Sequence, residues 1–254
     1  MLIVEKYGRL GNNILQLLKV ISYSLSFVVP EKIDLRTLKQ YQSEVFKNCP
    51  DYLFDNDTVE MKRSFWDKNI DDNKYKKIME IVTEILDIKM ECDVDFDNTL
   101  IIHVRGGDAL NTTGRINWKH VPFYVYKDII DNSHYKKILV VSEDKTNPVI
   151  SKILDTYSNS YFQSNSVDTD FKLIANALYV VDSQSSFTTT AILLNKDIKT
   201  LYTSNILSTE TKTQYHSTTN VIKYDLKDYA KLKFTSTEER DKYLLLDNNP
   251  HLNT

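Results

Sequence analysis

The residues best suited to chemistry lie in a short run, His-Val-Arg-Gly-Gly-Asp, at positions 103–108. The guanidinium of Arg105 has a planar fork of donors that can grip two phosphate oxygens at once. The two glycines that follow it let the backbone come close to a ligand. The plain alternative is a surface loop in which Arg105 pairs with Asp108, and His103, which opens the run, belongs to a residue type that more often packs than titrates. The run therefore predicts a diphosphate site, with the surface loop left as the alternative.

Glycine is scarce in this chain and is concentrated in two loops. Average usage is about 7% of residues, but only five of the 254 residues are glycine, and four of these lie at positions 8, 11, 106 and 107. The first cluster, Gly8-Arg9-Leu-Gly11-Asn12, precedes a helical pattern for which Asn12 is a suitable N-cap. A Gly-x-x-Gly turn before a helix is by itself more often structural. Because glycine is avoided elsewhere, we expect both loops to approach a ligand.

Two further polar loops follow apolar runs. Ser142, Glu143 and Asp144 come directly after residues 137–141, and adjacent acids before a helix also serve simply to complement its dipole. Residues 182–190 read Asp-Ser-Gln-Ser-Ser-Phe-Thr-Thr-Thr, and such hydroxyl groups are usually helix caps. Hydroxyl and free N–H groups at a helix start also form a good phosphate seat. Upstream, Asp170 is either an N-cap or an acceptor for the edge of a nucleotide base.

The order of the apolar segments predicts an α/β protein. Runs rich in β-branched residues alternate with helix-period segments in the second half, which favours a parallel sheet with helices on both faces. The expected strands there are 100–104, 137–141, 160–162, 178–181, 198–202 and 221–224, and the expected helices are 122–131, 147–157, 170–177 and 186–195. In the first half we expect a strand at 2–6, helices at 12–27 and 71–88, and a weakly helical stretch at 35–52. Ligands of open parallel sheets bind beyond the carboxyl ends of the strands, where the polar loops fall.

Composition excludes some classes of partner. The net charge is −3, and 26% of residues are charged, so nothing marks a nucleic-acid-binding protein. The sequence opens without a basic segment or a cleavage site. Its most apolar stretch, 14–29, is too short to span a bilayer and contains Lys19. We therefore expect a soluble, cytoplasmic protein with no transmembrane segment and no nucleic-acid partner.

Taken in order along the chain, the four loops resemble the motifs of the α1,2-/α1,6-/protein O-fucosyltransferase superfamily, and their order is most similar to that of the α1,2-fucosyltransferases. Residues 8–12 are similar to the opening G-x-x-G-N loop, and residues 103–108 to the H-x-R-R-G-D motif. Residues 142–144 resemble the S-D-D segment. Asp170 together with residues 185–187 resembles the last motif, which lies on the nucleotide. The resemblance covers the first three quarters of the chain.

The resemblance implies a GT-B-like α/β architecture, in which two Rossmann-like domains with parallel sheets hold a GDP-sugar. Residues 1–95 would form a short, acceptor-side N-terminal domain, residues 96–235 the nucleotide-sugar-binding domain, and residues 236–254 a C-terminal tail. It also implies a glycosyltransferase that moves fucose from GDP-fucose to a hydroxyl of a glycan acceptor with inversion. The GDP-sugar would be a co-substrate, and neither a metal ion nor another cofactor would be needed.

The resemblance also assigns roles to single residues. The catalytic residues would be Arg105 and Asp108. Arg105 would neutralise the leaving β-phosphate. Asp108 would order residues 103–108, called the arginine loop below, and is a candidate general base. Asp170 would hold the guanine edge, and Ser185 and Ser186 would seat the phosphates. The remaining donor-binding residues would be Gly8, Arg9, Gly11, Asn12, His103, Ser142, Glu143, Asp144, Phe187 and Thr188.

Two departures from the family pattern leave alternatives open. Gly106 stands where the motif has its second arginine, which removes one phosphate contact. Residues 188–190 are all threonine where a Ser-Trp-Trp run is common. The first alternative is therefore a transferase of the same fold that uses another sugar nucleotide. The second is a catalytically decayed protein that binds a nucleotide or a glycan. A hydrolase of the same fold class would be expected to carry a G-x-S-x-G elbow or a P-loop, and neither is present.

Overall fold

The computed structural model describes residues 2–3, 9–24, 32–41, 43–54, 72–90, 93–107, 110, 120–183, 185–204, 219–224, 226, 232 and 234–248. Among these residues, no helix is both long enough and apolar enough to cross a membrane. The statements below concern the described residues.

A six-stranded parallel sheet forms the second half of the chain. Its strands are β4 (Thr99–His103), β5 (Lys137–Val141), β6 (Ser160–Gln163), β7 (Tyr179–Val181), β8 (Thr200–Ser204) and β9 (Asn220–Tyr224). They lie in the order β6-β5-β4-β7-β8-β9, and every neighbouring pair is parallel. Numbered from β4, this order is 3-2-1-4-5-6, the order of a Rossmann-type sheet. The chain is therefore an α/β protein with a Rossmann-like sheet, as its apolar pattern predicts.

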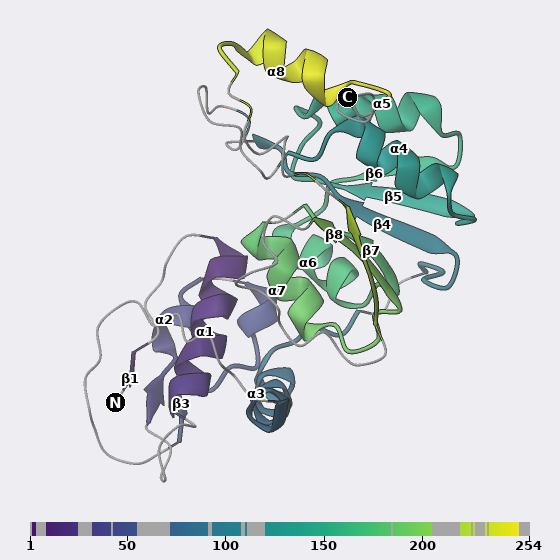
Figure 1. The fold of residues 1–254 in the computed structure, drawn as a ribbon. Coiled ribbons are helices and arrows are strands. Elements are labelled where there is room, and N and C mark those ends of the chain that lie inside the picture. The colour runs from purple at the N-terminus through teal and green to yellow at the C-terminus, as the bar shows by residue number, and fades with distance from the viewer. Residues whose placement is uncertain are drawn as a thin grey trace.

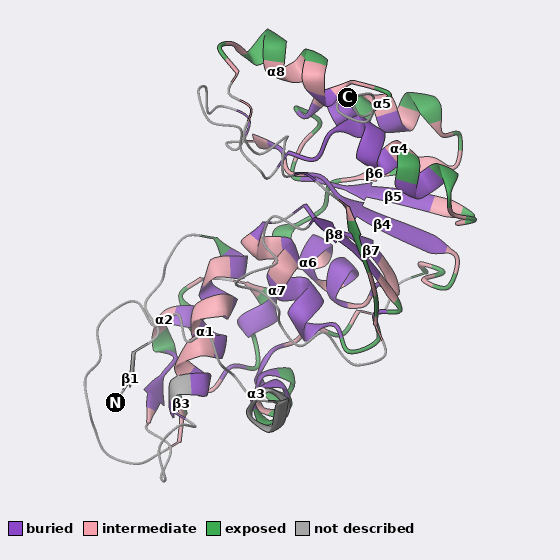
Figure 2. Ribbon diagram, in the orientation of Figure 1, coloured by how far each residue is buried: buried purple, intermediate pink, exposed green. Residues whose placement is uncertain are grey.

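Helices cover both faces of this sheet (Figure 1). α4 (Phe123–Asp131), α5 (Pro148–Thr156) and α8 (Thr237–Leu244) pack on one face, and α6 (Val167–Ala175) and α7 (Ser186–Leu194) pack on the other. Alternate residues of β4, β5, β7 and β8 belong to the two cores: Ile101 of β4 lies on the α6–α7 side, and Leu100 and Ile102 lie on the α4–α5 side. The central strands are buried on both faces, as Figure 2 shows, which explains their continuous apolar runs.

The first half of the chain is less regular. It contains α1 (Leu10–Ser24), α2 (Arg36–Lys39), the 3-10 turn η1 (Glu44–Phe46) and α3 (Asp72–Ile85). A small sheet pairs β1 (Leu2–Ile3) with β2 (Ile33–Asp34) in parallel, and β2 with β3 (Tyr52–Leu53) in antiparallel orientation. This sheet is mixed, so the expectation of a wholly parallel N-terminal sheet is wrong for the described strands. The weakly helical stretch expected at 35–52 is likewise wrong, because only two short turns of helix form there.

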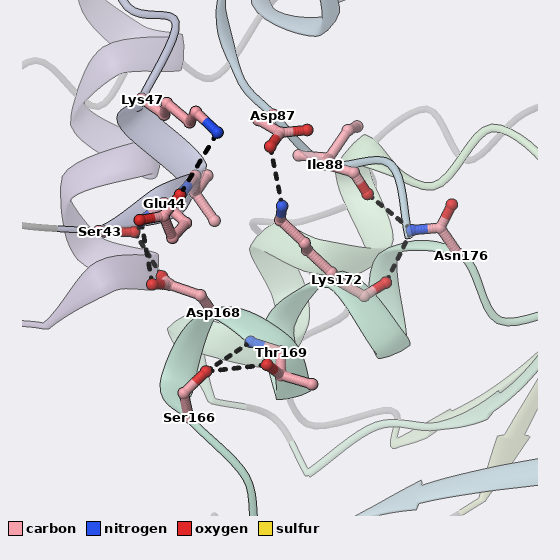
Figure 3. A network of polar contacts seen from close by, with 11 residues as sticks. Ser43, Glu44, Lys47, Asp87, Ile88, Ser166, Asp168, Thr169, Lys172 and Asn176 are labelled. Atoms are coloured by element: carbon pink, nitrogen blue, oxygen red, sulfur yellow. Dashed lines mark hydrogen bonds and ion pairs between the residues drawn. The ribbon is translucent and has the colours of Figure 1, made fainter. Parts of the chain in front are cut away.

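The two halves share one hydrophobic core. Leu10, Ile14 and Leu17 of α1 join Phe171 of α6 and Ala191 of α7 in a continuous buried cluster. Polar contacts along one side of α6 extend this interface (Figure 3). The residues that make these contacts are spaced one helical turn apart, so they lie on the same face of the helix. The proposed boundary at residue 95 and the GT-B arrangement stay predictions.

Those polar contacts come from Asp168 and Lys172 of α6 and from Asn176, its C-cap. The carboxylate of Asp168 accepts hydrogen bonds from the Ser43 hydroxyl (2.5 Å) and the Glu44 backbone N–H (3.0 Å). Lys172 forms an ion pair with Asp87 at 3.0 Å. The Asn176 amide donates to the carbonyl of Ile88 at 2.7 Å. The start of η1 and the segment after α3 are thereby fixed against α6.

Two expected helix starts are wrong for the same reason. α1 begins at Leu10, so Asn12 lies in its first turn and is not the N-cap. α6 begins at Val167, where the Ser166 hydroxyl accepts from the Thr169 N–H, so Asp170 is not an N-cap either. In each case a helix starts before the polar residue that the sequence pattern offered as its cap.

The segment assigned to a C-terminal tail contains α8. Ser236 caps this helix by accepting from the Glu239 N–H at 3.2 Å, and Leu244 is fully buried against the α4–α5 core. Lys152 of α5 donates to the Leu245 carbonyl at 2.5 Å. Arg240 donates to the carbonyl of Leu110, which lies just beyond the arginine loop. α8 is therefore tied to Leu110 as well as to the α4–α5 core.

Candidate functional site

The candidate site lies at the carboxyl ends of β4 and β7. These strands are neighbours in the sheet, but the chain leaves β4 toward β5 on one side and leaves β7 toward β8 on the other. Their loops therefore diverge at a topological switch point, which is where open α/β sheets bind ligands. We call the region between these loops the crevice. The arginine loop follows β4, and the hydroxyl-rich segment follows β7. The sheet topology thus brings together two of the loops singled out from the sequence.

His103 joins these two loops in the interior of the site. Its Nδ1 lies 2.5 Å from the Ser183 hydroxyl and 2.8 Å from the Thr188 hydroxyl. Its ring stacks at 5.4 Å from that of Phe187. Burial, reinforced by the charge of Arg105, lowers the pKa of His103 to about 3. His103 is therefore neutral at physiological pH and holds the two loops together as a packing residue.

The start of α7 is built from hydroxyl groups that bond to one another. Ser185 is the N-cap and accepts from the Thr188 N–H at 3.1 Å, while the Ser185 and Thr188 hydroxyls lie 2.9 Å apart. Both side chains are buried, whereas Ser186 and Phe187 are partly exposed. Phe187 also meets Phe171 edge to face at 5.5 Å. The partly exposed residues of this helix start are thus Ser186 and Phe187, and their backbone is packed against Gly11 of α1.

The arginine loop is held from the start of α5. The Asn147 side chain caps α5 by accepting from the Val149 N–H at 3.0 Å, and it donates to the Arg105 carbonyl at 2.9 Å. Asn147 is fully buried, and Arg105 is partly exposed. One amide therefore fixes both a helix start and the backbone of the proposed catalytic arginine. The pair Asn147-Pro148 marks a helix start in the sequence, but nothing in the sequence signals the contact with Arg105.

The glycines of this loop pack against side chains of the loop after β5. A Cβ added at Gly106 would lie 2.7 Å from the Asp144 carboxylate and 3.0 Å from the Ser142 hydroxyl. Gly107 has φ +58°, and a Cβ there would meet the Glu143 carboxylate. A side chain at position 106 would have to displace the side chains of Asp144 and Ser142, and the positive φ favours glycine at position 107.

The loop after β5 contributes three polar side chains to the crevice. The Asp144 carboxylate accepts from the Thr146 N–H at 2.9 Å and from its hydroxyl at 2.5 Å. Burial acts to raise the pKa of Asp144, but these hydrogen bonds and one from the Gly107 backbone lower it overall. The Ser142 hydroxyl is buried and has no hydrogen-bond partner in the structure as described. Asp144 is thus an ionised acceptor that orders the turn at Gly106 and Gly107.

Asp170 lies beside the crevice, in the first turns of α6. It is 6% exposed, and its carboxylate accepts from the Asn165 backbone N–H at 3.3 Å and the Asn165 amide at 3.1 Å. Burial raises the pKa of Asp170 to about 6, against the effect of these two hydrogen bonds. Asn165 is exposed, so its amide covers the carboxylate from the solvent side.

The glycine loop of the first half reaches the same crevice. Gly11 is buried in α1, where a Cβ would lie 2.6 Å from the backbone of Phe187 and Ser186. Arg9, immediately before α1, forms an ion pair with Glu143 at 2.5 Å. Asn12 is partly exposed in the first turn of α1. Gly8 and Asp108, which the sequence also assigns to the site, lie outside the described residues.

Three residues that the sequence reasoning did not assign to the site organise these loops. Asn147 holds the Arg105 backbone, Ser183 bonds to His103, and Asn165 covers Asp170. Among the described residues, no group of three His, Cys, Asp or Glu side chains is placed to hold a metal ion. Comparison with models of protein families finds no match to this chain, and comparison with curated proteins finds none either.

Proposed function

We propose that this protein is an inverting glycosyltransferase that transfers fucose from GDP-fucose to a hydroxyl group of an acceptor glycan. The observation that carries the proposal is that the Arg105 loop and the start of α7 at Ser186 follow β4 and β7, the two strands at the switch point of a Rossmann-like sheet. The buried carboxylate of Asp170 lies on α6, whose Phe171 contacts Phe187 of α7. The donor sugar is supported by the motif resemblance, and the nucleotide site is supported by this placement.

In the proposed reaction, the acceptor hydroxyl oxygen bonds to the anomeric carbon and gives up its proton, for which Asp108 is the candidate base, while the bond from that carbon to the β-phosphate oxygen breaks. Negative charge builds on the departing diphosphate as the sugar becomes oxocarbenium-like. A guanidinium that is already fixed beside that diphosphate stabilises the transition state more than the ground state, which accelerates the step. We assign this role to Arg105, whose backbone is fixed by Asn147. The N–H groups at the start of α7 would bind the phosphate oxygens, and Asp170 would accept from the guanine edge.

The proposal is tested first by nucleotide binding. In a thermal-shift panel of GDP-, UDP- and dTDP-sugars, the GDP-sugar should raise the melting temperature most, because only guanine offers two adjacent N–H donors to Asp170. A nucleotide at 100 times its dissociation constant adds about 2.7 kcal/mol to the free energy of unfolding. GDP affinity measured by calorimetry should be unchanged by EDTA. Stabilisation by UDP-sugars alone would overturn the choice of GDP, and loss of binding in EDTA would overturn the metal-independent reaction.

A further inference from the structure

The ion pair between Arg9 and Glu143 joins the two halves of the chain beside the crevice. Arg9 precedes α1 in the first half, and Glu143 follows β5 in the second. The Nη1 of Arg9 lies 2.5 Å from Glu143 Oε2, and the two side chains are 55% and 36% exposed. Exposed ion pairs contribute about 0–1 kcal/mol to stability. The pair is therefore one that another anion can replace at little cost.

The Glu143 carboxylate occupies the place where an anion would meet the arginine loop. One of its oxygens faces Arg9, and the other lies so close to Gly107 that a Cβ there would be 1.9 Å away. Gly107 is two residues from Arg105 in the same loop. A single carboxylate thus separates the Arg9 guanidinium from the turn beside the proposed catalytic arginine. A carboxylate and a phosphate present similar pairs of oxygens to a guanidinium.

From this arrangement we infer that Arg9 is a second cation for the diphosphate and that Glu143 is its counterion in the absence of ligand. On binding, a diphosphate oxygen pair replaces the Glu143 carboxylate on Arg9. Glu143 is then a specificity-determining residue, because it opposes weakly charged or poorly placed anions and yields only to one that reaches both arginines. This inference rests on the proposed function, since it takes the ligand of the crevice to be a diphosphate.

The supports of both residues favour an exchange of side chains without a movement of the two halves. The Arg9 carbonyl accepts from the N–H groups of Asn12 (3.0 Å) and Asn13 (3.3 Å), which fixes its backbone to α1. α1 is in turn packed on α7 at Gly11. The Glu143 carbonyl accepts from the Ser164 hydroxyl at 3.0 Å. The backbones are held, so only the two exposed side chains need to rearrange.

The test measures binding of GDP and of inorganic pyrophosphate by calorimetry in four proteins: the parent, Glu143→Gln, Arg9→Gln and the double variant. Removing the counterion should tighten binding of both ligands roughly threefold to tenfold. Arg9→Gln should weaken both by about tenfold or more. In the double variant, the gain from Glu143→Gln should vanish, because the arginine that it released is gone. The increase in affinity caused by Glu143→Gln should also be smaller at high salt, where exposed charges are screened.

A matched control is available at the opposite edge of the sheet. Lys199 and Asp97 form an exposed ion pair at 2.8 Å, beside the amino ends of β8 and β4. Asp97→Asn removes the same charge as Glu143→Gln, far from the carboxyl ends, and should leave pyrophosphate affinity within about twofold of the parent. If Asp97→Asn tightens binding as much as Glu143→Gln does, the effect is one of net charge and the exchange is refuted.

The remaining outcomes separate the inference from the proposed function. Binding of GDP by the parent with no gain in Glu143→Gln, or with an equal gain in the Arg9→Gln background, overturns the exchange and leaves the proposed function standing. Failure of all four proteins to bind either ligand, with normal melting temperatures, overturns both. Binding of pyrophosphate with the expected pattern but no preference for GDP keeps the exchange and overturns the guanine assignment.

Discussion

The crevice has a packed side and a charged side, and the two are built on opposite principles. The packed side consists of His103, Ser183, Thr188, Gly11 and Phe187, which are buried or half-buried and whose polar atoms bond to one another. The charged side consists of Arg9, Arg105, Glu143 and Asp144, which are partly or fully exposed. The packed side fixes distances between loops, and the charged side is available to a ligand.

This difference teaches that the same motif can contribute to structure at one position and to function two residues away. His103 faces the packed side, where burial keeps it neutral. Arg105, in the same run, lies at the charged side. Likewise Gly11 is fixed against α7, whereas Arg9 ends in an exposed ion pair. Substitutions on the packed side should therefore change stability, and substitutions on the charged side should change binding and turnover.

The largest expected effect is on the charged side, in Arg105→Lys. Lysine keeps the charge but loses the planar fork that grips two phosphate oxygens. Loss of one preorganised donor of this kind lowers the rate by about 10²–10³-fold. Initial rates with GDP-fucose and an acceptor glycan should show this loss at an unchanged melting temperature. A variant that melts normally and retains turnover within about threefold of the parent, against that estimate, would contradict the assignment of Arg105.

The next effect is on the packed side, in Gly11→Ala. The added methyl group would lie 2.6 Å from backbone atoms of Phe187 and Ser186, so α1 and α7 must move apart. Such overpacking costs about 1–3 kcal/mol, partly offset by the better helix propensity of alanine. Urea unfolding should show a lower free energy of unfolding. Asn12→Ala, one residue along the same helix, is the control, and an equal loss in that variant would show that the contact at Gly11 is not the cause.

The smallest effect tests Asp170, at the border of the two sides. Burial raises the pKa of Asp170 in the folded protein to about 6, above its ordinary value of 3.8, so the folded protein binds the proton more tightly than the unfolded chain does. Its contribution to the free energy of unfolding therefore rises as pH falls from 8 to 5, by about 1 kcal/mol. Asp170→Asn lacks this titration. As pH falls from 8 to 5, unfolding curves should show a larger increase in the free energy of unfolding for the parent than for Asp170→Asn. Equal changes in the two proteins would mean that the pKa of Asp170 is near its usual value.

Much of the second half could be predicted from the sequence, because its strands are buried on both faces. A strand such as β5 has to be apolar throughout, and its boundaries, 137 and 141, are as expected. The loops at the carboxyl ends follow from the same pattern, since parallel strands place them at one edge. This is why the sequence alone assigns Arg105, Ser142 and Ser186 to one region.

The parts that could not be predicted depend on contacts between distant segments. The apolar pattern of residues 35–52 suits a helix, but Leu35, Leu38, Val45 and Phe46 face the shared core from short turns and bends. α8 is mostly polar, and its place is fixed by Leu244 and Arg240, neither of which forms a periodic signal. The role of Asn147 depends on a carbonyl group 42 residues away in the sequence. Local pattern carries no information on such partners.

The contact between Arg240 and the Leu110 carbonyl has a consequence for how the protein is made. A chain synthesised from its N-terminus completes the six strands before α8 exists, because β9 ends at Tyr224 and α8 begins at Thr237. The nascent sheet can therefore assemble while the segment beyond the arginine loop still lacks its tether from α8. Ligand affinity should thus be acquired last, so that a chain ended after Tyr224 keeps all six strands of the described sheet but lacks the contact from α8 to Leu110.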